Sequence, residues 1–460
     1  MIGLPPFLSF SENERILQLK TLMIILRTVK NISSLNIAAS VLLFLAAILA
    51  AVVANSSLSP VYQDFLLQEL HLRIGNFNLF SHGGHPLKMI EFINDCLMTV
   101  FFLAVGLEIK RELLVGELSS VRKAALPFIA ACGGMVVPVV IYALSVASGT
   151  PETRGMAIPM ATDIAFSLGV LSLLGKRVPL SLKIFLTAFA VVDDIGGILV
   201  IALFYSADVA YGYLIAAAVL YVFLYYMGKF GVTQKIFFLF FGVIIWYLFL
   251  QSGIHSTISG VILAFVIPAR PRLDAGKYIE RIRDIIGEFP VSKSDNIVLT
   301  NAQIATLKQV ERASDYVISP LQSLEDNLHG AVSFVILPLF AFANAGVVFS
   351  GSGSIVGDVS IAVAAGLLLG KFLGIHLFTW LAVKSGVALM PAGMNWKNIA
   401  GVSLLGGIGF TVSLFIANLS FADEYPELLN QAKFGVLVGT VLAGVLGYVV
   451  LNWVLPEREK

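Results

Sequence analysis

Two adjacent aspartates, Asp193 and Asp194, interrupt a long apolar run in the segment AVVDDIGG. An ionisable side chain near the centre of a bilayer is costly, so its presence there is by default a sign of function. A structural salt bridge needs one carboxylate for each base, whereas two adjacent carboxylates suit a positive charge that arrives and leaves. Hard cations such as sodium prefer oxygen ligands, as calcium and magnesium do. The pair therefore predicts a cation site, and the alternative is that it pins a broken helix.

Helix geometry divides the two acids between different partners. Adjacent helix positions point about 100° apart and do not face each other. One of Asp193 and Asp194 should therefore face an ion path while its neighbour meets another partner. Lys371, in the apolar stretch LLLGKFLGIH, is a candidate for that partner, or it could offset the negative ends of broken helices. A purely structural ion pair is the alternative for this lysine.

Two further segments carry polar residues and glycines inside otherwise apolar spans. Thr162, Asp163 and Ser167 lie in TDIAFSLG, shortly after Pro159, and the stretch 406–413 reads GGIGFTVS. Glycine weakens a helix, and unwound backbone is tolerated at membrane depth only beside protein or water. Paired broken spans in the two halves of a chain are typical of the ion sites of inverted-repeat transporters. Asp163 could offset the positive ends of the half-helices, whereas the glycines alone could instead serve close helix packing.

A third group of ionisable residues lies near predicted span ends: Glu108, Glu112, His255 and Glu325. These residues could anchor the helices at the membrane interface. Alternatively, they form a cytoplasmic mouth whose titration tunes access, because histidine changes charge between about pH 5 and 8 and neighbouring acids perturb each other's titration. Asp95 is one more acid within a predicted span.

The elements that must position these residues are membrane-spanning helices. The chain of 460 residues is 58% hydrophobic and only 13% charged, with a mean hydropathy of +0.89, against about 25% charged residues in soluble domains. A net charge of +1 argues against nucleic-acid binding, and Cys96 and Cys132 indicate neither a disulfide framework nor a metal site. Since each spanning helix needs about 20 apolar residues, the sequence predicts twelve spans, at 36–55, 90–114, 124–147, 156–174, 179–205, 209–227, 234–250, 253–268, 328–349, 359–383, 398–420 and 432–455.

The distribution of positive charge sets the expected orientation. Cytoplasmic loops carry an excess of lysine and arginine, so the set of alternate loops and termini that holds nearly all of them should be cytoplasmic. The chain then divides into a cytoplasmic extension, one membrane domain and a cytoplasmic tail, at 1–35, 36–455 and 456–460. Of the 30 lysines and arginines, the exceptions to this rule are Arg73, Lys88, Arg154, Lys371 and Lys433.

Two loops are long enough to have structure of their own. The external loop 56–89 contains LRIGNFNL, whose alternation around Gly75 and Asn76 predicts a short hairpin. The cytoplasmic loop 269–327 has mixed charge. Its segment 277–286 predicts a short amphipathic helix, and a solvated linker is the alternative.

The chain resembles the NhaA-type sodium/proton antiporters from about residue 36 to 455. The likeness rests on long, specific segments: INDCLMTVFFLAVGLEIKREL (93–113), AIPMATDIAFSLGVLSLLGKRVPLSLKIFL (157–186), VVDDIGGI (191–198), LPLFAFANAGV (337–347), LLGKFLGI (368–375) and GGIGFTVSLFIANLSF (406–421). The resemblance implies an all-α polytopic membrane protein with inverted repeats and two broken helices, spans 4 and 11. Because this family is one of the examples from which the inverted-repeat rule was drawn, that architecture comes from the likeness alone. The loop 269–327 and the N-terminal segment are longer than expected for the family.

The resemblance also implies roles at the ion site. Asp194 matches the primary sodium ligand, with Asp193 beside it. Lys371 matches a lysine thought to pair with the acid at 193, and Thr162 and Asp163 match the broken fourth span. Four residues match positions tied to pH response, namely Glu108, Glu112, His255 and Glu325. Asp95 matches an acid near the external end of the second span.

The family resembled here consists of transporters and not of enzymes. Its members imply an electrogenic antiporter that extrudes sodium, or lithium, in exchange for protons, and that responds to pH. They also imply a multi-pass protein of the bacterial inner membrane with both termini cytoplasmic, no cofactor, and a homodimer held through the external hairpin.

One shared site that holds either sodium or protons would explain such exchange. Binding of a cation to a buried carboxylate releases its proton, as metal binding does at other sites, and opening to each side in turn completes the exchange. A cation channel and a sodium-coupled symporter are the alternatives within transport. An intramembrane aspartyl protease fits poorly, because its two aspartates lie on different spans.

Overall fold

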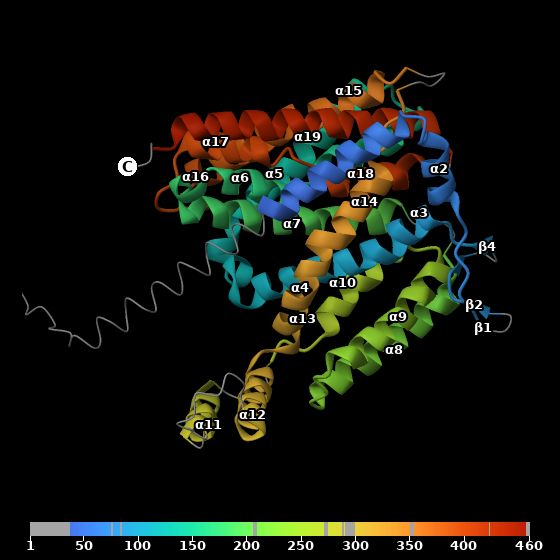
Figure 1. Cartoon of the computed structure of the whole chain (residues 1–460). Helices are drawn as coiled ribbons and strands as arrows, with labels where there is room; N and C mark the ends of the chain where they lie inside the picture. Colours follow the sequence, from blue (N-terminus) through green and yellow to red (C-terminus); the bar gives the residue numbers. More distant parts are fainter. Residues whose placement is uncertain are drawn as a thin grey trace, which may run out of the picture.

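The protein is described here by a computed structural model, which covers residues 37–74, 77–82, 85–205, 209–270, 275–287, 289, 300–349, 354–422 and 424–456. The predicted cytoplasmic segment 1–35 and nearly all of the tail at 456–460 lie outside the described residues. Within them the chain is almost entirely helical, with two short β-hairpins (Figure 1).

Nine described helices are long and apolar enough to cross a membrane. Three of them contain a π-helical turn, an irregularity that is frequent at functional sites. The nine are Ile37–Ala54, α3–η1–α4 (Met89–Phe92, Ile93–Leu97, Met98–Val115), α5 (Val121–Ser145), α7 (Leu180–Phe204), α8 (Tyr211–Lys229), α9 (Lys235–Ser252), α13–η5–α14 (Pro320–Ala331, Val332–Ile336, Leu337–Asn344), α15–η6–α16 (Asp358–Ala365, Gly366–Gly370, Lys371–Lys384) and α19 (Pro426–Val454).

Two further spans are broken, at the places that the sequence predicts. The 3₁₀ helix η3 (Pro151–Met160) and α6 (Ile164–Leu173) meet at a bend of 45°, and α17 (Trp396–Leu405) and α18 (Phe410–Phe421) meet at a bend of 44°. Together with the short apolar helix α10 (Thr257–Val266), these elements coincide with the twelve predicted stretches. The all-α polytopic fold with two broken helices is therefore confirmed.

One predicted boundary is wrong by eight residues. The span predicted at 328–349 begins at Pro320. The Ser319 side chain accepts a hydrogen bond from the Gln322 backbone N–H, and proline occupies the first helical position, which are two strong helix-start signals. The first turns of α13 are polar enough that hydropathy alone does not detect them.

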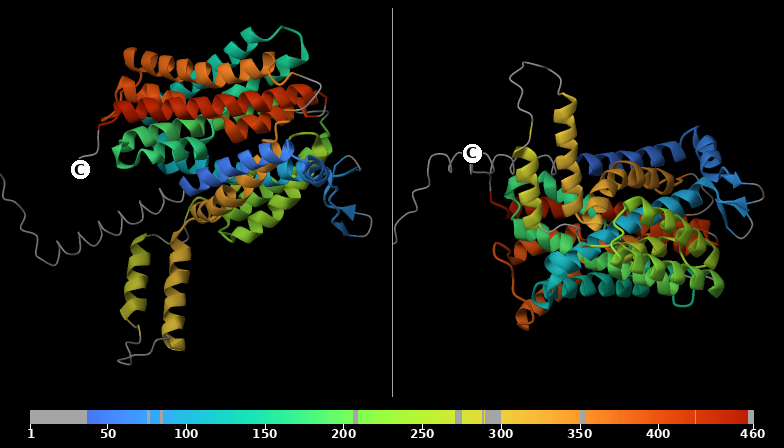
Figure 2. Two further views of the ribbon diagram at one scale, coloured as in Figure 1. Left: turned by 45° about the horizontal axis from the view of Figure 1, so that its top comes forward. Right: turned by 90° about the horizontal axis from the view of Figure 1, so that it is seen from below.

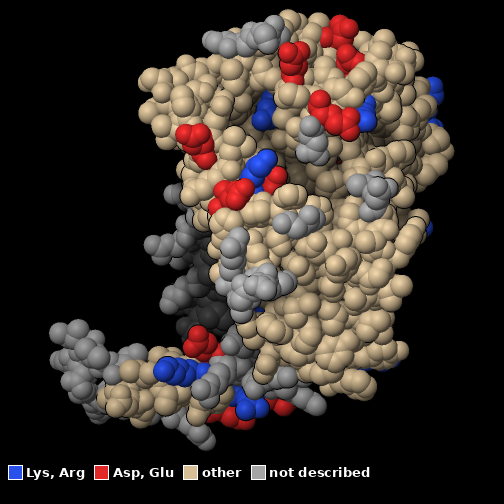
Figure 3. Space-filling view, turned by 90° about the vertical axis from the view of Figure 1, so that its right-hand side faces the viewer, with Lys and Arg blue, Asp and Glu red and all other residues tan. Residues whose placement is uncertain are grey.

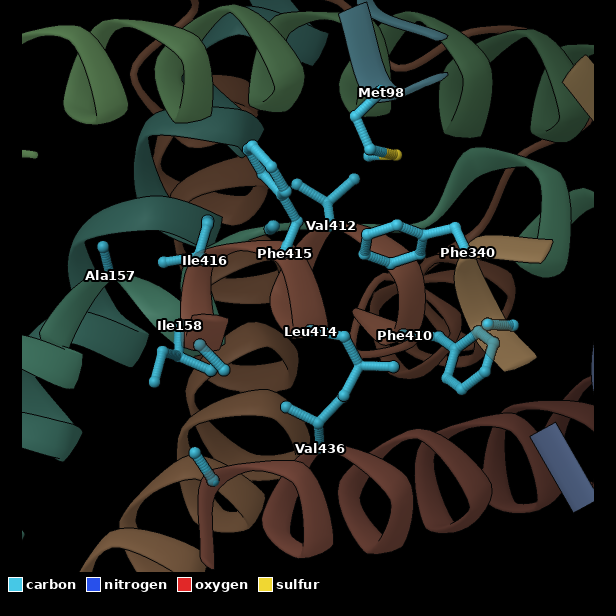
Figure 4. Close-up of a cluster of buried hydrophobic side chains, with 14 of the residues drawn as sticks. Met98, Ala157, Ile158, Phe340, Phe410, Val412, Leu414, Phe415, Ile416 and Val436 are labelled. Atoms are coloured by element: carbon cyan, nitrogen blue, oxygen red, sulfur yellow. The ribbon is translucent and has the colours of Figure 1, made fainter. Parts of the chain in front are cut away.

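The helices pack as two bodies around separate apolar clusters. The site body comprises η3, α5, α6, α7 and α15–α19, and its cluster includes Phe189, Ile375 and Leu405. The panel body comprises α3, α4, α8–α10, α13 and α14, and its cluster includes Leu107, Phe238 and Leu324. A third cluster lies between them and joins residues of both (Figure 4).

The two ends of the molecule differ in their loops. We call one end the hairpin side, because it carries β1–β2 (Arg73–Ile74, Phe77–Asn78) and β3–β4 (Ser81–His82, His85–Pro86). The first hairpin pairs Arg73 with Asn78 and Ile74 with Phe77, as predicted, whereas the second hairpin was not predicted. Figure 3 looks onto this side, where charged side chains gather over the upper half of the face in view. Helix α2 (Ser59–Leu67) leads into the hairpins.

We call the opposite end the loop side. The described C-terminal residues lie there, and the segment 269–327 contributes α11 (Ala275–Gly287) and α12 (Asn301–Val317). These two helices pack on each other and project away from the two bodies, as Figure 1 and the left panel of Figure 2 show. Helix α11 confirms the amphipathic helix predicted at 277–286, and α12 was not predicted.

The outward surface of the spans is apolar. Leu144, Leu203 and Trp453 are 82%, 75% and 86% exposed. Exposed apolar patches of this extent are unusual on soluble monomers. Lipid is the solvent that such a surface requires.

Candidate functional site

The two broken spans cross inside the site body, and Asp163 joins them. The Phe166 N–H donates to Asp163 Oδ1 at 2.9 Å, so this carboxylate caps the N-terminus of α6. Thr411 donates to Asp163 Oδ2 from its hydroxyl at 2.6 Å and from its N–H at 3.2 Å, at the N-terminus of α18. One buried carboxylate therefore faces the positive ends of two half-helices, as helix dipoles favour.

At the same crossing, side-chain hydroxyl groups donate hydrogen bonds to backbone carbonyls at the C-terminal end of α17. Thr162 Oγ1 donates to the Gly406 carbonyl at 2.8 Å, and Ser167 Oγ donates to the Leu405 carbonyl at 3.0 Å. The Asp163 N–H donates to the Ile408 carbonyl at 2.7 Å. The unwound backbone is thus paired across the crossing, which is the condition for irregular backbone at membrane depth.

Helix α7 brings the acid pair to this crossing. Lys371 Nζ donates to Asp193 Oδ2 at 2.6 Å and to Thr162 Oγ1 at 3.0 Å. Lys371 is 0% exposed and Asp193 is 1% exposed, so the ion pair is sealed from solvent. Among the described residues, Asp193 Oδ1 has no hydrogen-bond donor. The pairing implied by the family resemblance is therefore present in the structure.

Asp194 points to a different environment. It lines a cavity of about 270 Å³ together with Thr162, Asp163 and Thr411, whereas Asp193 does not line it. This is the division that helix geometry predicts for adjacent residues: one acid faces open space while the other meets a fixed base. Carboxylate and hydroxyl oxygens of this kind suit a hard monovalent cation.

The cavity extends from Asp194 to charged residues nearer the loop side. Glu108, Arg111, Glu325 and His329 line that end. Arg111 Nε donates to Glu325 Oε1 at 2.9 Å, and Arg111 Nη2 lies 3.2 Å from Glu112 Oε1. Three of the four residues predicted at a titrating mouth are thus gathered around one arginine.

His255 does not line this cavity, and its predicted part in the pH response stays a prediction. It precedes α10 at the hairpin side, because α9 starts near α13 and crosses to that side, where Gln251 donates to the Ser81 carbonyl in β3. Beside it, Ser256 Oγ donates to Asp95 Oδ1 at 3.2 Å. Asp95 itself lies in the π-helical turn η1, near the start of the second span as expected.

Two functional contacts were missed in the sequence. Thr411 lies in GGIGFTVS, and its position two residues after the third glycine could have marked it as a helix-start donor. Arg111 was not predicted as a site residue, and its contact with Glu325 joins residues 214 positions apart. Among the described residues, no group of three or more His, Cys, Asp or Glu side chains could hold a metal ion.

These features define a class of protein. A multi-pass membrane protein holds two crossed, broken helices around a buried acid pair and a lysine, with a cavity leading from one acid to one end of the bundle. This is the architecture of a membrane ion transporter in which the ion binds where half-helices meet.

Comparison with known proteins identifies the family. The family model described as Na+/H+ antiporter 1 matches residues 30–451. The Na(+)/H(+) antiporter NhaA of Bacteroides thetaiotaomicron is 74% identical over 438 residues, which are 95% of this chain and 100% of that protein. The antiporter of the same name from Bacteroides fragilis is 75% identical over 437 residues, 95% of this chain and 100% of that protein. The Na(+)/H(+) antiporter NhaA 1 of Saccharophagus degradans is 42% identical over 424 residues, 91% of this chain and 90% of that protein.

The chain belongs to the Na+/H+ antiporter 1 family. It is a sodium/proton antiporter and a multi-pass membrane protein, and it is not an enzyme. Among the alternatives left open by the sequence, family membership decides against the channel, the symporter and the aspartyl protease.

Proposed function

We propose that sodium and protons are exchanged at a single site in which Asp194 is the carboxylate that binds either ion. The observation that carries this proposal is the cavity, which reaches Asp194 and leaves Asp193 sealed against Lys371. A solvent-connected carboxylate can receive an ion from one side of the membrane. A carboxylate already neutralised by a buried lysine has no need of one.

Competition between the two ions follows from burial. A charged carboxylate away from bulk water is costly unless a cation or a proton neutralises it. Sodium binding therefore displaces the proton, and proton binding displaces sodium, in the same way that metal binding to a protein site releases protons. Lithium, which has the same charge and is also a hard cation, would compete at the same oxygens.

Electrogenic exchange requires a second group that carries a proton beside Asp194. Asp163 lines the same cavity, and the Asp193–Lys371 pair is adjacent to it through Thr162. We assign Thr162 and Asp163 to ion coordination and helix-end compensation, and Lys371 to charge compensation of Asp193. No cofactor is needed for this chemistry.

The loop side is assigned to the cytoplasm of a bacterial cell with the protein in its inner membrane. Lysine and arginine are concentrated in the loops of this side, as the positive-inside rule requires. Sodium would then enter the described cavity from the cytoplasm. We also propose a homodimer through the hairpins at the external end, and that both termini are cytoplasmic.

The mouth is proposed to tune access with pH. Glu108, Glu112 and Glu325 surround Arg111, so protonation of any one of them changes the charge that sodium meets. The variant Glu325→Gln removes one titrating group and keeps a hydrogen-bond acceptor for Arg111. It should shift the pH profile of exchange without loss of maximal rate, and an unchanged profile would remove Glu325 from regulation.

The test of the function uses everted membrane vesicles from a strain without its own antiporters. The vesicles are energised, sodium is added at several pH values, and a fluorescent dye follows the pH gradient. Sodium should collapse the gradient in the natural protein and not in Asp194→Asn. The matched control is Asp64→Asn, the same chemical change at an exposed position of α2, which should exchange normally. Normal exchange in Asp194→Asn would contradict the assignment.

A further inference from the structure

Three asparagines form a hydrogen-bonded cluster where the two bodies meet near the hairpin side. Asn344 of α14 donates to Asn94 Oδ1 of η1 at 2.8 Å, and Asn418 of α18 donates to Asn344 Oδ1 at 2.9 Å. Asn344 is 0% exposed and Asn418 is 8% exposed. We call these residues the asparagine cluster. Since Asn418 belongs to the site body and the other two to the panel body, the cluster bridges the seam between them.

Two of the three amides are also anchored to their own helices. Asn344 Nδ2 donates to the Phe340 carbonyl at 3.0 Å, and Asn418 Nδ2 donates to the Leu414 carbonyl at 2.8 Å. Only one bond, that from Asn418 to Asn344, ties the site body to the panel body within the cluster. The hydrogen bond between Asn418 and Asn344 can break while the hydrogen bonds within each body remain, so the two bodies can part at this position.

An aromatic layer lies between the asparagine cluster and the ion site, on the same three spans. Phe102 of α4 and Phe340 of α14 both contact Phe415 of α18, with ring centroids 5.6 Å and 6.4 Å apart. All three are buried, at 3%, 0% and 0% exposed. Figure 4 shows Phe415 and Phe340 on either side of Val412. A dry layer of this kind excludes ions, because nothing in it replaces their hydration.

The described cavity ends at the level of the aromatic layer and stops short of the asparagine cluster. Its lining ends at Phe101 on α4, Leu337 on α14 and Val412 on α18. From those residues to the three asparagines is six or seven positions along each helix, or about 10 Å at 1.5 Å per residue. The ion site is therefore open toward the loop side and closed toward the hairpin side by an aromatic layer followed by an amide layer.

We propose that the asparagine cluster is the latch of the hairpin-side gate. It holds this end of the seam closed while the ion site faces the loop side, and the bond between Asn418 and Asn344 breaks when the site opens toward the hairpin side. Amides suit this role because water can replace their mutual hydrogen bonds once the seam parts. An all-apolar contact would instead expose its surface to water on opening. The inference concerns gating and builds on the antiport function.

A cross-link across the seam tests the latch. In a background with Cys96→Ser and Cys132→Ser, the double variant Asn344→Cys/Asn418→Cys places two thiols where the amides touch. Oxidation should slow sodium-dependent collapse of the pH gradient in everted vesicles at least tenfold, and reduction should restore it. The matched controls are the two single-cysteine variants, whose exchange should not respond to oxidation.

The contrary result is specific. A double variant whose cross-link is verified by mass spectrometry and which still exchanges at its reduced rate would show that the seam does not open at this point. Recovery of exchange after reduction shows that the cross-link itself, and not damage to the fold, blocks transport. Activity of the reduced form separates failure of the latch from failure of the antiport function.

A second measurement does not depend on the cross-link. In right-side-out vesicles, a membrane-impermeant thiol reagent is applied to the variant Phe340→Cys, which lies behind the cluster and keeps all three amides, in the Cys96→Ser/Cys132→Ser background, with and without Asn418→Ala. Loss of the Asn418 amide should raise the rate of modification severalfold, because the closed state loses its bridging bond. An equal rate in both backgrounds would overturn the proposal.

Discussion

Removal of the lysine at the ion site should destabilise the protein through the carboxylate that it leaves behind. In Lys371→Met the side chain keeps a similar length and loses its charge. Asp193, 1% exposed, then has no base beside it. At 2.6 Å the gross attraction of the pair is about 6 kcal/mol for an effective dielectric constant of about 20. The cost of desolvating both groups offsets much of this attraction. Removing one partner leaves an uncompensated buried charge, so we expect Lys371→Met to lower the free energy of unfolding by about 3–5 kcal/mol.

The double variant decides whether the pair is the cause. Removing both charges in Lys371→Met/Asp193→Asn leaves no unpaired charge at these two positions, so most of the lost stability should return. The free energy of unfolding of all four proteins is measured by equilibrium denaturation in mixed detergent micelles. The expected coupling energy exceeds about 2 kcal/mol. Single variants that each cost under about 1 kcal/mol, with effects that simply add, would refute the reasoning.

Two further substitutions probe the crossing and the packing of the site body. Thr411→Val removes the hydroxyl that donates to Asp163 Oδ2 at 2.6 Å, which should cost about 1.5–3 kcal/mol of stability and raise the sodium concentration for half-maximal exchange. Thr411→Ser should behave like the natural protein, and equal behaviour of the two variants would count against the bond. Gly374→Ala places a Cβ inside the van der Waals radius of the Gly133 carbonyl oxygen, so α5 and α16 must move apart at a cost of about 1–3 kcal/mol. The matched change Gly197→Ala meets nothing within 4 Å and should leave the thermal unfolding temperature equal or higher, and a similar loss in both variants would contradict the packing argument.

Hydropathy was sufficient to locate the spans, because lipid imposes one simple requirement on every spanning helix. Glycines and polar residues in TDIAFSLG and GGIGFTVS were sufficient to predict both breaks. The choice between Asp193 and Asp194 was not accessible from residue types. Helix geometry says that they point apart, but only the rotation of α7 within the bundle says which one meets Lys371 and which one meets the cavity.

The features that sequence reasoning missed depend on long-range contacts. His255 resembles the mouth residues in type, and its separation from them follows from the direction in which α9 and α10 cross the bundle. A single asparagine within an apolar helix gives no sign of which distant side chains it will contact. The asparagine cluster joins positions 250 and 74 residues apart, so no local pattern reveals it. The second hairpin, Ser81–His82 with His85–Pro86, is too short for an alternating pattern to develop.

The central claim is that sodium and protons compete for Asp194, and release of protons on sodium binding tests it most directly. Purified protein in weakly buffered detergent solution receives sodium while a pH indicator records the protons released. Choline, a cation too large for the site, serves as the control addition. We predict proton release that saturates with sodium in the natural protein and is absent in Asp194→Asn. Saturable sodium binding without proton release, or the same release from Asp194→Asn, would contradict a shared site.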